Sequence, residues 1–113
     1  MKVPNIANGV VSQEKVVGYL LRMPPDGTPR SQVFKGPIFR EALGWSEETW
    51  WQLSASLKEI GVNNEVVQVR ERPHGINYRV DGDIQGPNGR RRVVRTIWHV
   101  DMGSDVPRLV SAY

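Results

Sequence analysis

The sequence predicts an α+β domain in which N-terminal helices pack on one face of a four-stranded, mainly antiparallel meander sheet. Two observations lead to this class. Apolar residues recur with the 3.6-residue period of a helix in the first half of the chain and with the 2-residue period of a strand in the second half. Glycine, proline and asparagine then separate the alternating segments, which is typical of strands joined by hairpins. We assign residues 1–113 to a single domain, because that length suits one hydrophobic core.

The chain starts with a lead-in at residues 1–11, and a helix follows. Ser12 can cap this helix through its hydroxyl, and Glu14 occupies the first turn, where the helix dipole favours a carboxylate. We expect the helix to run to about Arg22. The proline and glycine content of residues 24–32 predicts a loop after it.

Two more helices are predicted before the sheet. The first is short, with Pro37 at a first helical position and Gly44 just past its end. The second is the clearest element of the chain, with Ser46 as its N-cap and Gly61 expected to end it. Its apolar face is formed by Trp50, Leu53, Leu57 and Ile60. The helical part of the domain therefore spans residues 12–61.

Four strands follow and form the sheet part of the domain, residues 65–113. We expect them at residues 65–71, 76–82, 89–101 and 106–113. The Asn-Gly pair in the turn between the second and third strands is a strong hairpin signal, because both residues tolerate a positive φ. Since the helices cover one face only, the other face of the sheet is expected to be free.

Composition excludes several functional classes. The chain has no cysteine, so it has no disulfide scaffold, thiolate metal site or cysteine nucleophile. It has neither an apolar run of the ~20 residues that cross a bilayer nor the core of a signal peptide, so we expect a cytoplasmic protein. A formal net charge of +3 and a pI of about 9.6 permit an acidic partner such as nucleic acid without demanding one.

The third predicted strand divides its side chains between two faces, because successive strand residues point in opposite directions. The helix-covered core is expected to receive Val94, Trp98 and Val100. Arg91, Arg95 and His99 then share the free face, where Asn77 and Arg79 of the second strand join them. The strand is therefore expected to build the core with one face and a basic surface with the other.

Two interpretations of this basic surface are open. Guanidinium groups donate two parallel hydrogen bonds to an oxyanion, which favours phosphate binding. Alternatively, Glu71, Asp81 and Asp83 pair with the arginines across the strands and give an ordinary solvated face.

The chemistry that the residues allow is limited. Neither histidine has a second ligand at metal-binding spacing, so no metal site is predicted, and we expect no cofactor. A ribonuclease that uses the 2′-hydroxyl of its own substrate needs a base, an acid and cations, but neither a metal nor a cysteine. The side chains that could supply these groups are Lys35, His74, Tyr78, Arg95, His99, Arg108 and Ser111.

Two stretches carry a resemblance to a known family. They are "KGPIFREALGW" at residues 35–45 and "GINYRVDGDIQGPNGRRRVVRTIWHVDMGSDVPRLVSAY" at residues 75–113. The chain resembles, over roughly residues 15–113, an uncharacterised family of small bacterial and mobile-element proteins with Val-Arg-Thr-Val-Trp and Pro-Arg-Leu-Val-Thr-Ala-Tyr-Pro patterns. Ser111 stands where that family usually has threonine.

That family is similar to the barnase–EndoU–colicin–RelE-like class of metal-independent nucleases found in toxins. The resemblance implies N-terminal helices and a four-stranded antiparallel sheet whose open face holds RNA. By position it selects Lys35, Arg95, Thr96 and Ser111 as polar candidates.

We therefore expect a metal-independent, RNA-cleaving or RNA-binding protein of toxin type. The candidate catalytic residues are Lys35, Arg95, His99 and Ser111. The candidate substrate-binding residues are Arg91, Arg108, Tyr78, His74 and Thr96. RNA is the expected partner, and a cognate protein such as an antitoxin is the second. The alternatives are a non-catalytic protein-binding module of immunity or adaptor type and a degenerate nuclease relative.

Overall fold

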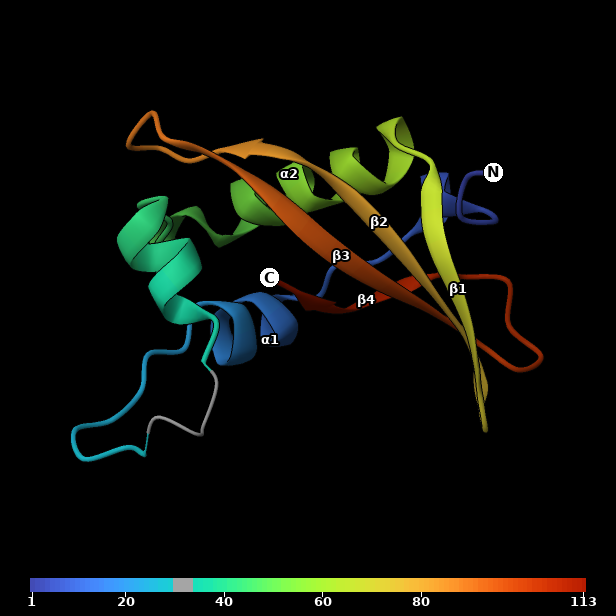
Figure 1. Ribbon diagram of the computed structural model, residues 1–113, viewed down its shortest axis with the longest axis horizontal. Helices are drawn as coiled ribbons and strands as arrows, with labels where there is room; N and C mark the ends of the chain where they lie inside the picture. Colours follow the sequence, from blue (N-terminus) through green and yellow to red (C-terminus); the bar gives the residue numbers. More distant parts are fainter. Residues whose placement is uncertain (30–33) are drawn as a thin grey trace.

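The fold was obtained as a computed structural model that describes residues 1–29 and 34–113. Helical segments occupy the first half of the chain, and four antiparallel strands in the order β1-β2-β3-β4 occupy the second half. The strands are β1 (Val66–Arg72), β2 (Gly75–Gln85), β3 (Arg91–Asp101) and β4 (Arg108–Ala112). Figure 1 shows the sheet in front of α2 (Trp50–Asn63), with its other face uncovered. The predicted fold class is confirmed.

The shorter helical segments precede α2. They are η1 (Ile6–Asn8), α1 (Gln13–Lys15), η2 (Val16–Leu20), η3 (Pro37–Ala42) and η4 (Glu47–Thr49). Ser12 caps α1 as predicted, since its hydroxyl accepts a hydrogen bond from the backbone nitrogen of Lys15 at 3.1 Å. The loop predicted at residues 24–32 is irregular where the structure describes it, and residues 30–32 lie outside the described part.

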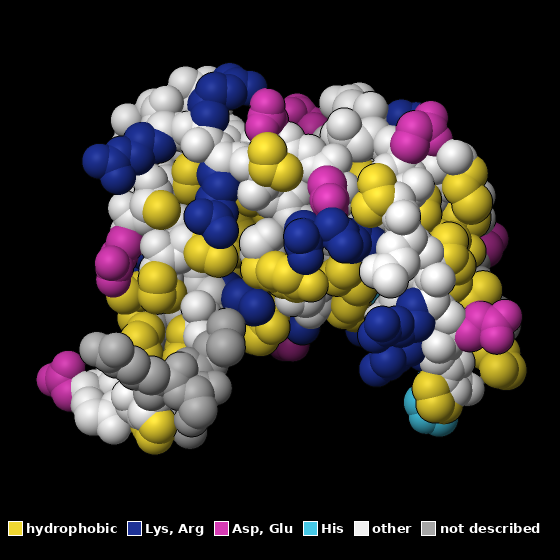
Figure 2. All heavy atoms as spheres, in the orientation of Figure 1, with side chains coloured by type: hydrophobic (Ala, Val, Ile, Leu, Met, Phe, Trp, Pro, Cys, Tyr) yellow, Lys and Arg dark blue, Asp and Glu magenta, His cyan; other side chains and the backbone are white. Residues whose placement is uncertain are grey.

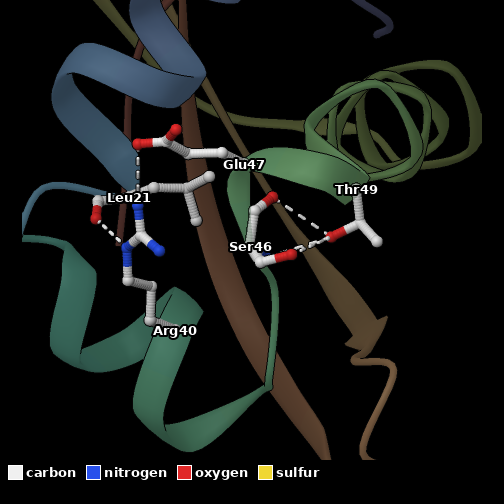
Figure 3. Close-up of polar contacts among 5 residues, drawn as sticks. All are labelled: Leu21, Arg40, Ser46, Glu47 and Thr49. Atoms are coloured by element: carbon white, nitrogen blue, oxygen red, sulfur yellow. Dashed lines mark hydrogen bonds and ion pairs between the residues drawn. The ribbon is translucent and has the colours of Figure 1, made fainter.

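The Arg40 side chain ties the middle helices together, and Ser46 and Thr49 cap η4 (Figure 3). The guanidinium of Arg40 donates a hydrogen bond to the carbonyl oxygen of Leu21 and lies 3.5 Å from the carboxylate of Glu47. Ser46 and Thr49 form a capping box, in which the Thr49 hydroxyl accepts a hydrogen bond from the Ser46 backbone at 3.0 Å. The bond from Arg40 to Leu21 holds η3, and with it the segment that carries Lys35, against the end of the first helix.

The end of α2 differs from the prediction. The helix continues past Gly61 to Asn63, and Gly61 is buried beneath the Trp98 ring. A Cβ atom at Gly61 would lie 3.0 Å from both the Trp98 ring and the Ile6 side chain. The expectation that Gly61 ends the helix is therefore wrong, because this glycine serves the close approach of α2 to the sheet.

The register of the sheet determines which side chains share a face. In β2 and β3, Asn77 pairs with His99, Arg79 with Ile97 and Asp81 with Arg95, and directly paired residues point to the same side. The opposite side packs on α2 and forms the core. Its largest members are Tyr78, Val80, Ile84, Val94, Trp98 and Leu109, against Leu53, Leu57 and Ile60 of the helix. Within the described residues, no helix is long and apolar enough to cross a membrane.

Candidate functional site

The uncovered side of the sheet, called the open face below, is rich in arginine. The side chains that the register assigns to it include Gln68, Arg70 and Arg72 of β1, Asn77, Arg79 and Asp81 of β2, Arg95, Ile97 and His99 of β3, and Arg108 and Ser111 of β4. Tyr113 joins them, because its backbone nitrogen and oxygen bond to the backbone of Arg95 at 3.0 and 2.7 Å. Figure 2 shows Lys and Arg side chains gathered over the middle and lower right of the sheet.

A groove of about 370 Å³ lies on the open face. It is lined by Gln68, Arg70, Arg72, Asn77, Arg79, Arg95, Ile97 and Tyr113. Four of these residues are arginines, contributed by three different strands, and no aspartate or glutamate is among the lining residues. A groove with this lining attracts anions, because its walls concentrate one sign of charge.

The ion pairs of the open face leave Arg95 available. Both oxygens of Asp81, which lies opposite Arg95, accept hydrogen bonds from the Arg79 guanidinium, at 3.0 and 2.8 Å. The bond from Arg79 is the main reason why the pKa of Asp81 is lowered, and the charge of Arg95 is a smaller reason. Among the described residues, no carboxylate lies within ion-pair distance of Arg70, Arg72 or Arg95. The alternative interpretation, in which acidic residues pair with the arginines across the strands, therefore does not hold for Arg95.

Lys35 and Arg95 meet at one aromatic ring. The Lys35 ammonium lies 4.5 Å from the centre of the Tyr113 ring, and the Arg95 guanidinium lies 5.9 Å from it. Both distances are in the range of cation–π contacts. The two predicted catalytic cations thus come together, although 60 residues of chain separate them.

Ser111 lies next to this cluster on the open face, opposite Ile97. Its hydroxyl oxygen is 3.4 Å from the phenol oxygen of Tyr19, whose ring also contacts the Lys15 ammonium at 4.6 Å. The first helix therefore supplies a further cation and a further hydroxyl at the β4 side of the face.

His99 is held in a polar network at the other end of the face, roughly 13 Å along β3 from Arg95. Its Nδ1 lies 2.6 Å from Oδ1 of Asn77, and its Nε2 lies 3.1 Å from Oδ1 of Asp101. The Arg108 guanidinium bonds the same Asp101 carboxylate at 3.1 and 3.3 Å, and this bond is the main reason why the pKa of Asp101 is lowered. Both ring nitrogens of His99 are thus engaged, so proton transfer by His99 requires one of these contacts to open.

The remaining sequence candidates lie elsewhere. Tyr78 and Thr96 are buried on the helix-covered side, where Thr96 bonds the Val80 carbonyl at 2.7 Å and the Trp98 indole nitrogen at 2.9 Å. His74 is exposed in the turn between β1 and β2. Arg91 bonds Gln85 at 3.3 Å at the start of β3 and lines a separate hollow beside α2. The structure therefore does not bring these four residues into the groove.

The groove residues that sequence reasoning does not single out include two arginines and a tyrosine, namely Arg70, Arg72 and Tyr113. The signal for the first two is the alternation of β1, which places both arginines on the side opposite to Val69. The signal for Tyr113 is its spacing of two from Ser111.

The geometry defines a class of protein: a small α+β protein with an arginine-lined groove on an open antiparallel sheet. Within residues 1–29 and 34–113, no group of three or more histidine, cysteine or acidic residues could hold a metal ion. The chain belongs to the family DUF6883, described as a domain of unknown function, whose model matches residues 2–113. The comparison with curated proteins finds no match.

A solved structure similar in fold comes from a toxin–immunity complex. A chain of the contact-dependent growth inhibition toxin–immunity protein complex from Klebsiella pneumoniae 342 superimposes with a TM-score of 0.70 and 17% sequence identity. The match covers 95% of this chain and 93% of the other. At this identity the likeness establishes a shared fold.

Proposed function

We propose that this chain is a toxin-type protein that binds RNA in the arginine groove of the open face and cleaves it without a metal. The observation that carries the proposal is the groove itself, in which four arginines from three strands line a hollow that no aspartate or glutamate side chain lines. Guanidinium groups bind phosphate through paired hydrogen bonds, so several of them in one groove suit a chain of phosphates. The fold shared with a chain of a growth-inhibition toxin–immunity complex supports a toxin-related role.

The proposed reaction uses the 2′-hydroxyl of the RNA. A base takes the hydroxyl proton, the 2′-oxygen bonds to phosphorus, and the bond from phosphorus to the 5′-oxygen breaks while an acid protonates that oxygen. The charge that builds on the phosphate needs nearby cations, and Arg95 and Lys35 are the candidates because both contact the Tyr113 ring. The group that transfers the proton is either the phenol of Tyr113, whose ring contacts both cations, or His99, which lies further along the strand.

Cleavage of single-stranded RNA in the presence of a chelator tests the proposal. We expect the wild-type protein to cleave, and Arg95→Ala to lose activity by about a hundredfold, the usual effect of removing one group that stabilises a transition state. Arg90→Ala is the matched control, because Arg90 is an exposed arginine in the turn before β3. Both variants should have the circular dichroism spectrum of the wild type. Equal cleavage by Arg95→Ala and wild type would contradict the proposed site.

A second candidate function is favoured by the same fold likeness, because the matching chain belongs to a complex of two proteins. In this case the open face binds a protein and performs no chemistry, as an immunity-type module would. The two functions separate cleanly in experiment. An immunity-type module neither cleaves RNA nor binds it in a salt-dependent manner, whereas a degenerate nuclease relative binds RNA with salt dependence and fails only in cleavage.

A further inference from the structure

The outer edge of β1 is free along most of its length. At the opposite margin of the sheet, Val10 covers β4 through backbone bonds of 2.9 Å to Pro107 and Leu109. At β1, the Met1 carbonyl bonds the Val66 nitrogen at 2.7 Å, and no further backbone bond to this edge occurs among the described residues. Figure 1 shows the N-terminal segment beside the upper end of β1 and no described helix or strand along the rest of its outer edge, although the loop between β3 and β4 crosses β1 in this view. An uncovered edge strand is a template for pairing with another chain.

The helix-covered side of the sheet is bare next to this edge. Val69 pairs with Tyr78 and yet is 51% exposed, whereas α2 packs on β2 and β3. Beyond it, a hollow of about 420 Å³ is lined in part by Ile76, Val100 and Met102, and Met102 is 77% exposed. On this side the β1 edge presents Val69 and Glu71, and the apolar side chains of the hollow lie next to them.

The open-face side of the same edge is basic. Arg70 and Arg72 alternate with Val69 and Glu71, and both arginines line the groove without a carboxylate partner in the described structure. A strand that added to β1 would place its own side chains alternately against Val69 and against these arginines, because cross-strand neighbours lie about 5 Å apart.

We propose that β1 accepts an extended segment of a protein partner as a fifth strand, and that this segment alternates apolar and acidic residues. Main-chain hydrogen bonds to the free edge would supply part of the affinity, and the side-chain alternation would supply the specificity. The acidic residues would lie beside Arg70 and Arg72, and the apolar residues beside Val69.

Charge argues against a second copy of this chain as the occupant. Pairing of β1 with itself would bring two further arginines to a face that already carries several without acidic partners.

Binding at this edge would regulate the groove. Carboxylates beside Arg70 and Arg72 would neutralise two of the four arginines that line it. This consequence, unlike the strand addition itself, rests on the proposed binding of RNA.

A peptide titration tests the proposal. The probe is a short peptide that alternates valine and glutamate, and the control peptide has the same residues in two blocks. We expect amide chemical shifts of the uniformly labelled protein to change most at Val67–Glu71 with the alternating peptide, and about fivefold weaker binding of the block peptide, equivalent to one cross-strand pair. Equal affinity for the two peptides, or shift changes that follow the basic residues rather than β1, would overturn the proposal.

Two variants sharpen the test. Val69→Lys should weaken binding of the alternating peptide about fivefold. It should leave RNA cleavage unchanged, because Val69 points away from the groove. The double variant Arg70→Glu/Arg72→Glu should prefer a valine–lysine peptide, whereas Arg90→Glu/Arg92→Glu, at the start of β3, should keep the wild-type preference.

The titration also separates this proposal from the proposed function, because it contains no RNA. If the protein does not cleave RNA, peptide binding still supports strand addition at β1. If the peptide does not bind, RNA cleavage still supports the proposed function. Shift changes at Val67–Glu71 that depend on protein concentration alone would identify a second copy as the occupant and overturn the choice of partner.

Discussion

Thr96 illustrates at the scale of one residue how β3 serves two faces. Its neighbours in sequence, Arg95 and Ile97, lie on the open face, while its own hydroxyl is fully buried. The hydroxyl donates to the Val80 carbonyl and accepts from the Trp98 indole. The family resemblance selects both Thr96 and Arg95 by position. The alternation of the strand shows that Thr96 points into the core and Arg95 points to the open face.

Thr96→Val is expected to lower the free energy of unfolding by about 1–3 kcal/mol, because it leaves the Trp98 indole nitrogen buried without a partner. The variant preserves the shape of the side chain. Thr96→Ser is the matched control, since it keeps the hydroxyl and removes one methyl group, with an expected loss of about 0.8 kcal/mol. Urea denaturation measures both, and a smaller loss in Thr96→Val than in Thr96→Ser would contradict the role of the hydroxyl.

The ion pair between Arg79 and Asp81 should make the stability of the protein depend on pH. The Arg79 guanidinium holds the pKa of the folded Asp81 carboxyl below its ordinary value of about 4. The unfolded chain therefore binds this proton more readily, so the stabilisation is present above about pH 4 and is lost as the pH falls through the folded pKa. We expect wild type to lose more stability than Asp81→Asn between about pH 5 and pH 2 in denaturant titrations. Parallel losses in the two proteins would contradict this.

At the scale of elements, the sequence correctly predicts where helices begin, because this depends on neighbouring residues. It does not predict the role of Gly61, because that role depends on tertiary packing. Ser12 and Ser46 mark helix starts because capping is a local hydrogen bond between a side chain and the next turn. An equally local signal, a glycine after the last apolar residue of the helix, wrongly predicts that Gly61 ends it. The role of Gly61 depends on its contact with Trp98 of β3, and the sequence around the helix gives no sign of this contact.

The two helical glycines give a matched prediction. Gly18→Ala is expected to stabilise the protein by about 0.5–1 kcal/mol, because a Cβ there meets no atom within 4 Å and alanine reduces the freedom of the unfolded chain. Gly61→Ala is expected to destabilise it by about 1–3 kcal/mol, because its Cβ would press on the buried Trp98 ring. Thermal and urea unfolding check both signs. Stabilisation by Gly61→Ala would show that the contact with Trp98 relaxes freely.

At the scale of the whole molecule, the open face is partly predictable from sequence. Period-2 alternation and one-sided helices place Arg95, Arg79 and His99 together, and the register confirms this. Lys35 could not be placed by such reasoning, because it reaches Tyr113 only through the packing of η3 against the first helix. The ion pairs are equally non-local, since Asp81 is taken by Arg79 on its own strand rather than by Arg95.

The salt dependence of RNA binding tests the central claim, that the arginine groove holds a chain of phosphates, most directly. The logarithm of the affinity for single-stranded RNA should fall linearly with the logarithm of salt concentration. Arg70→Ala and Arg95→Ala should each reduce the slope by about 0.7, because each removes one phosphate contact and its released counterion. An affinity that does not respond to salt, or slopes unchanged in both variants, would contradict the claim.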